Sequence, residues 1–176
     1  MKKIFALILA LAMLSSFALA EAGLTSFKTY DISGGDPSDM KMVSQDIFAP
    51  YDLTMVNIWA TWCGYCVQEM PELAKLKTML PENVNLISLC TDADEETELA
   101  MQILQMTGAN NFTTLMETEE MYDGQLLADV YAFPTTYFLD SEGMPVCPPV
   151  TGVPSLQDAA GAYLAIINDV LASMEA

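Results

Sequence analysis

The chain has 176 residues, about one domain's worth, and it is strongly acidic, with 24 Asp and Glu against six Lys. It contains neither Arg nor His, so it lacks the cations that a nucleic-acid surface needs to neutralise phosphates. The same composition excludes His-based acid–base catalysis, His metal ligation and Ser-His-Asp chemistry. Any proton transfer must use a carboxylate, a thiol, a Tyr or water.

The first twenty residues have the pattern of a secretory signal peptide. Lys2 and Lys3 precede an apolar run over residues 4–14, and small residues lead up to Ala20. We expect cleavage after Ala20, which would leave residues 21–176 as the mature domain with a net charge of about −20. An uncleaved membrane anchor is the alternative. Either outcome places the domain outside the cytoplasmic membrane, periplasmic or secreted, where disulfides persist.

The chain begins after this segment with an irregular stretch over residues 21–54. Residues 26–31 alternate as a short strand does, and we interpret the stretch as an N-terminal hairpin or cap over the main sheet. Residues 55–60 are nearly all apolar, which is typical of a central buried strand. A helix is then expected over residues 67–80, kinked at Pro71.

Residues 84–90 predict a second buried strand, and the acidic residues 91–98 are expected to open a helix that runs to Gly108. Carboxylates suit the positive end of a helix dipole. We therefore interpret this acidic run as capping and solvation; a calcium site is the less favoured alternative, because the glycine and spacing of a known calcium loop are missing. The run comprises Asp92, Asp94, Glu95, Glu96 and Glu98.

The last third of the chain predicts a short strand at residues 112–115, a helix at 124–131 with Tyr131 facing inward, and a strand at 135–140. A turn and a return strand at 144–147 follow, and a final amphipathic helix runs from the N-cap pair Ser155 and Asp158 to about residue 174. Alternating strands and helices of this kind make an α/β fold, whose sites lie at the carboxyl ends of the strands.

Two cysteines three residues apart, Cys63 and Cys66, lie where the central strand is followed by a helix. Cys63 would lie over the unpaired N–H groups at the helix start, where the dipole favours an anion and lowers the thiol pKa. Cys66 would lie one helical turn further on, close enough to bridge. We therefore expect Cys63 to attack a disulfide and Cys66 to resolve the mixed disulfide.

From about Phe27 onward the chain resembles the thioredoxin superfamily, and most of all its extracytoplasmic TlpA/ResA-type branch. The resemblance rests on residues 56–66, which include Trp62-Cys63-Gly64-Tyr65-Cys66, on Glu69 and Pro71, and on residues 133–136. It implies a thioredoxin-like α/β fold, with a central mixed sheet flanked by helices and an N-terminal hairpin extension. It also implies that the bond before Pro134 is cis.

The resemblance extends to the site residues. It implies that Glu69 handles the proton of the dithiol and that Pro134 binds an extended substrate backbone. The other residues expected at the substrate surface are Trp62, Gly64, Tyr65 and Phe133. Asn57 departs from cytoplasmic thioredoxins, which carry a buried Asp there, so Glu69 gains importance. Trp59 is interpreted as core packing.

Two further cysteines, Cys90 and Cys147, are expected on strands at opposite sides of the sheet, too far apart for a disulfide. We interpret both as buried free thiols. A second disulfide, or a redox relay from Cys90, stays as an alternative.

Together these observations predict an extracytoplasmic thiol–disulfide oxidoreductase that acts on protein substrates through the Cys63–Cys66 dithiol. The resemblance favours a monomeric reductant for cytochrome c maturation or the repair of exported thiols, with a membrane electron donor of the CcdA/DsbD type and without cofactor or metal. One alternative is a disulfide-forming oxidant. Another is a copper-binding module that uses Cys and Met ligands. A peroxidase is disfavoured, because the chain has no Arg.

Overall fold

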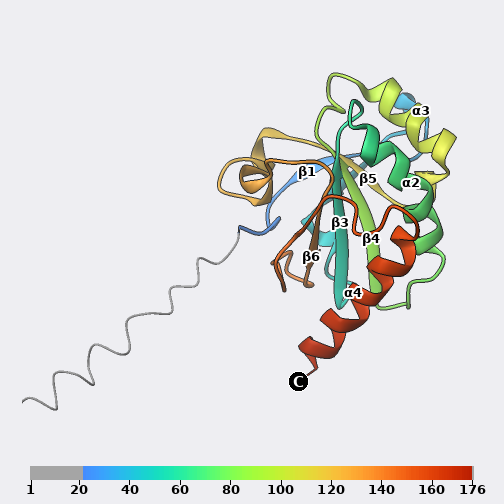
Figure 1. The fold of residues 1–176 in the computed structure, drawn as a ribbon. Coiled ribbons are helices and arrows are strands. Elements are labelled where there is room, and N and C mark those ends of the chain that lie inside the picture. Colours follow the sequence, from blue (N-terminus) through green and yellow to red (C-terminus); the bar gives the residue numbers. More distant parts are fainter. Residues whose placement is uncertain (1–21, 176) are drawn as a thin grey trace, which may run out of the picture.

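The computed structural model describes residues 22–175, which form a seven-stranded mixed sheet with three α-helices (Figure 1). The strand order is β2-β1-β5-β4-β3-β6-β7. The strands are β1 Lys28–Asp31, β2 Lys41–Ser44, β3 Leu53–Trp59, β4 Val84–Cys90, β5 Thr114–Met116, β6 Thr135–Leu139 and β7 Val150–Thr151. The helices are α2 Gly64–Lys77, α3 Thr97–Thr107 and α4 Ala159–Met174.

The predicted signal peptide lies outside the described residues. Within residues 22–175, the helices are too short or too polar to cross a bilayer. The predicted N-terminal hairpin is confirmed, because β1 and β2 pair in antiparallel fashion next to β5.

The centre of the sheet is the parallel pair β3 and β4, whose residues are buried along their whole length. Side chains alternate between two faces, as the strand geometry requires. One face packs against α2, α3 and α4, and the other is covered by the N-terminal stretch and the segment 117–130 (Figure 1). Burial on both faces explains why both strand sequences are almost continuously apolar.

Asn57 interrupts the apolar row on the helix-facing side of β3. Met55 and Trp59, two residues before and after it, belong to the core under the helices. The register places Asn57 directly opposite Thr136 of β6. A polar pair is thus fixed in the middle of an apolar face, where its polar atoms need hydrogen-bond partners.

The predicted helix at 124–131 is wrong. Residues Leu126–Asp129 form a short 3-10 turn, and Tyr131 is 90% exposed instead of facing inward. The physical reason is that polar groups here have partners far along the chain. The Gln125 side-chain oxygen accepts hydrogen bonds from the backbone N–H groups of residues 25 and 26, and its nitrogen donates to the carbonyl of residue 26. The Leu126 N–H donates to the carbonyl of Gly23. Long-range contacts therefore override the local helical pattern.

Three predicted boundaries also move. The helix after the cysteines begins at Gly64, earlier than predicted, and α3 begins only at Thr97. Residues 91–96 are turns, so most of the acidic run precedes the helix. The return strand is reduced to a single bridge between Leu139 and Pro145, and regular pairing with β6 resumes at β7.

Candidate active site

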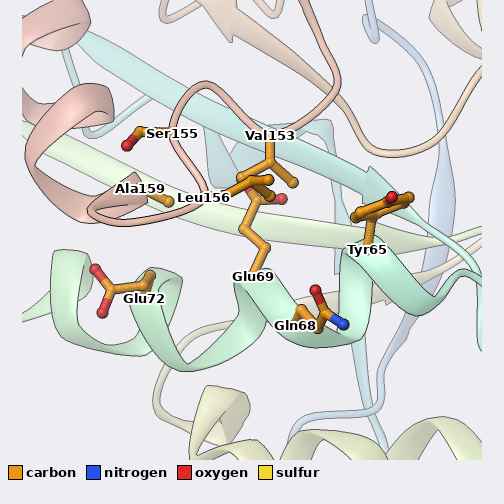
Figure 2. Close-up of a pocket in the computed structure, with 8 residues that line it drawn as sticks. All are labelled: Tyr65, Gln68, Glu69, Glu72, Val153, Ser155, Leu156 and Ala159. Carbon is orange, nitrogen blue, oxygen red and sulfur yellow. The ribbon is translucent and has the colours of Figure 1, made fainter.

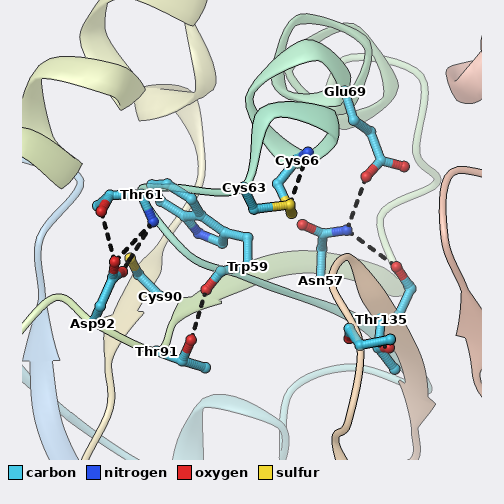
Figure 3. Close-up of a disulfide and its surroundings, with 12 residues drawn as sticks. Asn57, Trp59, Thr61, Cys63, Cys66, Glu69, Cys90, Thr91, Asp92 and Thr135 are labelled. Atoms are coloured by element: carbon cyan, nitrogen blue, oxygen red, sulfur yellow. Dashed lines mark hydrogen bonds between the residues drawn. A yellow bond between two sulfur atoms is a disulfide. The ribbon is translucent and has the colours of Figure 1, made fainter.

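A disulfide joins Cys63 and Cys66 at the point where β3 is followed by α2 (Figure 3). Cys63 is the N-cap residue of α2, and its Sγ accepts a hydrogen bond from the backbone N–H of Cys66 at 3.2 Å. Cys63 is 7% exposed, whereas Cys66 is fully buried. In the reduced protein this N–H and the helix dipole would stabilise a Cys63 thiolate.

The turn that precedes Cys63 is held by Asp92, which comes from the loop after β4. The Asp92 carboxylate accepts from the backbone N–H of Thr61 at 3.0 and 3.1 Å and from its hydroxyl at 2.6 Å. The prediction that the Asp92 carboxylate serves capping and solvation is therefore wrong for this residue. Its position at the end of a strand next to β3 was the available signal.

Apolar side chains surround the disulfide on the surface. Trp62 is 72% exposed and Tyr65 is 64% exposed. The Phe133 ring lies 5.6 Å from the Trp62 ring, edge to face, which places the loop of Pro134 beside the cysteine motif. The bond between Phe133 and Pro134 is cis. Gly64 is the first residue of α2, and nothing lies close to where its Cβ would be.

Glu69 lies one helical turn beyond Cys66 and is 2% exposed. Asn57 Nδ2 donates to Glu69 Oε2 at 3.4 Å (Figure 3). Burial raises the pKa of Glu69 to about 7, and the nearby Tyr163 hydroxyl and Asn57 amide oppose part of that rise. Such a carboxyl can gain or lose a proton near neutral pH, as general acid–base work requires.

A small cleft of about 110 Å³ connects Glu69 with the surface (Figure 2). Tyr65, Gln68 and Glu72 of α2 form one side, and the stretch from Val153 to Ala159 forms the other. A volume of this size can hold several water molecules, which are needed to carry a proton to and from a buried carboxyl.

The remaining sulfur and indole groups take no part in the disulfide. Cys90 is a buried free thiol whose Sγ lies 3.2 Å from Asp92 Oδ1, and its burial raises the thiol pKa. Within residues 22–175 the disulfide joins Cys63 and Cys66, and none links Cys90 with Cys147, which is half-buried rather than buried as predicted. Trp59 is buried and donates to Ser88, so it belongs to the core. Within residues 22–175, no three carboxylate or cysteine side chains are grouped as metal ligands.

The strand order, the cis proline loop and a disulfide at a helix N-terminus define a thioredoxin-like protein. The family model for Redoxin matches residues 33–144, and the chain belongs to this family.

Two known proteins resemble the chain in sequence. It is 29% identical over 90 residues to the thioredoxin-like protein YneN of Bacillus subtilis, covering 51% of each chain. It is 32% identical over 104 residues to the thiol:disulfide interchange protein DsbE of Haemophilus influenzae, covering 59% of this chain and 54% of that one. The chain thus spans about half the length of these relatives.

A solved structure shows the same fold. The thiol:disulfide interchange protein of the thioredoxin family from Chlorobium tepidum superposes with a TM-score of 0.62 at 18% identity, covering 82% of this chain and 95% of that one.

Proposed function

We propose that this protein is an extracytoplasmic thiol–disulfide oxidoreductase that exchanges disulfides with protein substrates through Cys63 and Cys66. The observation that carries the proposal is the pairing of a partly accessible cysteine at a helix N-terminus with a buried cysteine one turn later. The names of the relatives DsbE and YneN support the same chemistry.

The exchange needs two displacements at sulfur. The Cys63 thiolate attacks a substrate disulfide, so that a bond from Cys63 to one substrate sulfur forms while the other sulfur leaves as a thiolate. The Cys66 thiolate then attacks Cys63, which releases the second substrate thiolate and forms the Cys63–Cys66 disulfide. Two electrons pass from the dithiol to the substrate, and the exposed Trp62 and Tyr65 offer apolar surface beside the reacting sulfur.

Glu69 is the proposed base for Cys66. Cys66 is buried, so its proton needs an acceptor inside the protein, and Glu69 lies on the next turn of the same helix. With a pKa of about 7, Glu69 can take this proton at neutral pH and release it to water in the cleft beside Tyr65.

The proposed direction is reduction of exported proteins, with cytochrome c maturation or the repair of exported thiols as the task. Electrons would come from a membrane donor of the CcdA/DsbD type, and the protein would act as a monomer. The predicted signal peptide supports the extracytoplasmic location. Pro134 and Phe133 are proposed to border the substrate backbone next to Cys63, and Gly64 leaves the approach open.

Substitution of the attacking cysteine tests the chemistry. We expect Cys63→Ser to lose all reduction of insulin disulfides, because no other accessible sulfur lies at the α2 N-terminus. Cys90→Ser is the matched control, since it removes a buried thiol that is not part of the disulfide, and it should keep the activity. Reductase activity in Cys63→Ser would contradict the proposal.

Substitution of the resolving cysteine tests the assigned roles. We expect Cys66→Ser to accumulate a mixed disulfide between Cys63 and a substrate protein, visible as a thiol-sensitive adduct by mass spectrometry. An adduct on Cys66 in Cys63→Ser, with none on Cys63 in Cys66→Ser, would reverse the roles.

The reduction potential of the Cys63–Cys66 pair tests the direction. A value near that of thioredoxin, about −270 mV, is expected for a reductant. A value near that of a strong oxidant, about −120 mV, would instead select disulfide formation as the function.

A further inference from the structure

Four buried polar side chains from different elements form one hydrogen-bonded group behind the disulfide. Asn57 Nδ2 donates to Thr136 Oγ1 at 3.1 Å and to Glu69 Oε2 at 3.4 Å. Thr136 Oγ1 and Tyr163 Oη lie 2.9 Å apart and share a hydrogen bond. All four side chains are buried, with exposed fractions of at most 2%. We call Asn57, Glu69, Thr136 and Tyr163 the buried polar quartet.

Two oxygen atoms of the quartet have no hydrogen-bond partner, namely Asn57 Oδ1 and Glu69 Oε1. A buried acceptor without a donor is costly, and native proteins rarely leave one unsatisfied. A proton on Glu69 supplies a donor inside the quartet and removes a negative charge whose burial is costly. The unpartnered oxygens therefore favour the protonated form of Glu69 while Cys63 and Cys66 are joined.

The hydrogen-bond directions within the quartet leave the Tyr163 hydroxyl available to Glu69. Thr136 Oγ1 already accepts from Asn57, so its own proton can point to Tyr163 Oη. The Tyr163 proton is then free to turn toward the Glu69 carboxyl, which lies close enough for the two groups to influence each other's pKa. In this structure Glu69 Oε1 makes no hydrogen bond, so that contact is not closed.

We propose that Tyr163 is a positioning residue for Glu69, whose hydroxyl, oriented by Thr136, turns to donate to the carboxylate whenever Glu69 loses its proton. The inference rests on the proposed function in that Glu69 serves the dithiol. It adds two residues from β6 and α4 that the resemblance did not supply. Neither touches the reacting sulfur atoms, so both act through Glu69.

The quartet also accounts for where the proton of Cys66 goes during the exchange. In the reduced protein the Glu69 carboxylate is held by Asn57 and Tyr163 and accepts the proton of Cys66. In the disulfide form the proton rests on Glu69 until water in the cleft removes it. The other titratable groups that face Glu69 are Cys66 on α2, Tyr163 on α4, and Tyr65 and Glu72 along the cleft. In the disulfide form Cys66 does not titrate.

The test is a pH titration of the Glu69 carboxyl carbon by NMR in oxidised protein carrying ¹³C-labelled Glu. The resonance is assigned by its absence in Glu69→Gln. We expect a midpoint near 7 in the unsubstituted protein. In Tyr163→Phe the midpoint should rise by about one pH unit, because one hydrogen bond to the charged form is lost.

Thr136 provides a second, independent variant. Thr136→Val should also raise the Glu69 midpoint, because the Tyr163 hydroxyl loses the partner that orients it, whereas Thr136→Ser should restore the original value. Tyr30→Phe, a substitution on the partly exposed strand β1, is the matched control and should leave the midpoint unchanged.

An unchanged or lowered Glu69 midpoint in folded Tyr163→Phe would overturn the inference, as would an ordinary midpoint in the unsubstituted protein. If Tyr163→Phe does not fold, the comparison of Thr136→Val with Thr136→Ser decides. Failure of the proposed function would be seen in a different experiment. Cys63→Ser would then keep its reductase activity whatever the Glu69 titration shows.

Discussion

Glu69 and Glu117 are the two acidic side chains that the described part of the chain buries. Burial raises the pKa of Glu69 to about 7 and that of Glu117 to about 8. Their surroundings differ, since Glu117 accepts from the backbone N–H of Ala93 and lies beside Asp94 in an acidic cleft. Glu69 instead lies one helical turn beyond Cys66, so its titration is expected to affect both stability and exchange.

The free energy of unfolding of the oxidised protein should depend on pH because Glu69 is buried. Because its pKa rises from an ordinary 4.5 to about 7 on folding, the folded protein binds the proton more tightly than the unfolded chain. The free energy of unfolding should therefore fall as pH rises from about 4.5 to about 7, by about 3 kcal/mol for this group. In Glu69→Gln this part of the fall should vanish.

Urea unfolding followed by circular dichroism, at about pH 4 and about pH 8, measures the difference between the two proteins. All other groups titrate alike in both, so the comparison isolates Glu69. An equal fall in stability for Glu69→Gln and the unsubstituted protein would contradict the assigned pKa.

At the level of elements, the site depends on the contact between the turn after β3 and the loop after β4. The Asp92 carboxylate accepts hydrogen bonds from the N–H and the hydroxyl of Thr61, which lies two residues before Cys63. A second link joins the Thr91 N–H to the carbonyl of Trp59 at 2.9 Å. The parallel pairing of the two strands brings these loops together at one edge of the sheet.

Removal of the Asp92 carboxylate should destabilise this turn. We expect Asp92→Ala to lower the free energy of unfolding by about 2 kcal/mol, because buried or part-buried hydrogen bonds to a charged group are lost. Hydrogen exchange of the Thr61 amide should become faster. Asp92→Asn keeps an acceptor oxygen and should show a smaller effect.

Glu95→Gln is the control, since Glu95 is exposed on the same loop. Equal stability and equal Thr61 exchange in Asp92→Ala and Glu95→Gln would show that the hydrogen bonds do not hold the turn.

For the molecule as a whole, charge is the dominant surface property. The formal net charge of the chain is −18. The loop at residues 91–96, which bonds the turn before Cys63, and the adjoining segment 117–123 contain carboxylates and no Lys. Such a field attracts cationic partners and repels anionic ones over distances of about one Debye length.

Substrate charge should therefore affect the rate of exchange. We expect a disulfide-linked peptide with flanking Lys to be reduced about tenfold faster than the same peptide with flanking Glu, at an ionic strength of about 0.01 M. Raising the ionic strength to about 1 M should remove most of the difference, because the Debye length falls from about 30 Å to about 3 Å. Stopped-flow kinetics of both peptides measures the effect. Equal rates at low salt would rule out electrostatic steering.

Part of the fold and of the candidate site could be predicted from the sequence. The dithiol and its flanking strand and helix follow from local patterns, since Cys63 and Cys66 are three residues apart and residues 55–60 are apolar apart from Asn57. The segment at 124–131 could not be predicted in this way. Its polar groups bond to residues about a hundred positions away, and no local pattern records such partners.

The sequence by itself determined the chemistry of this protein: two thiols at a helix start, one nearby carboxyl, and neither His nor Arg to replace them. Only the tertiary structure decided how that carboxyl behaves. Asn57, Thr136 and Tyr163 come from β3, β6 and α4, and they meet Glu69 only when the sheet register and the packing of α4 are complete. The physical reason is that the pKa of a buried group depends on its burial and on its hydrogen-bond partners, and both arise from contacts between residues far apart in the chain.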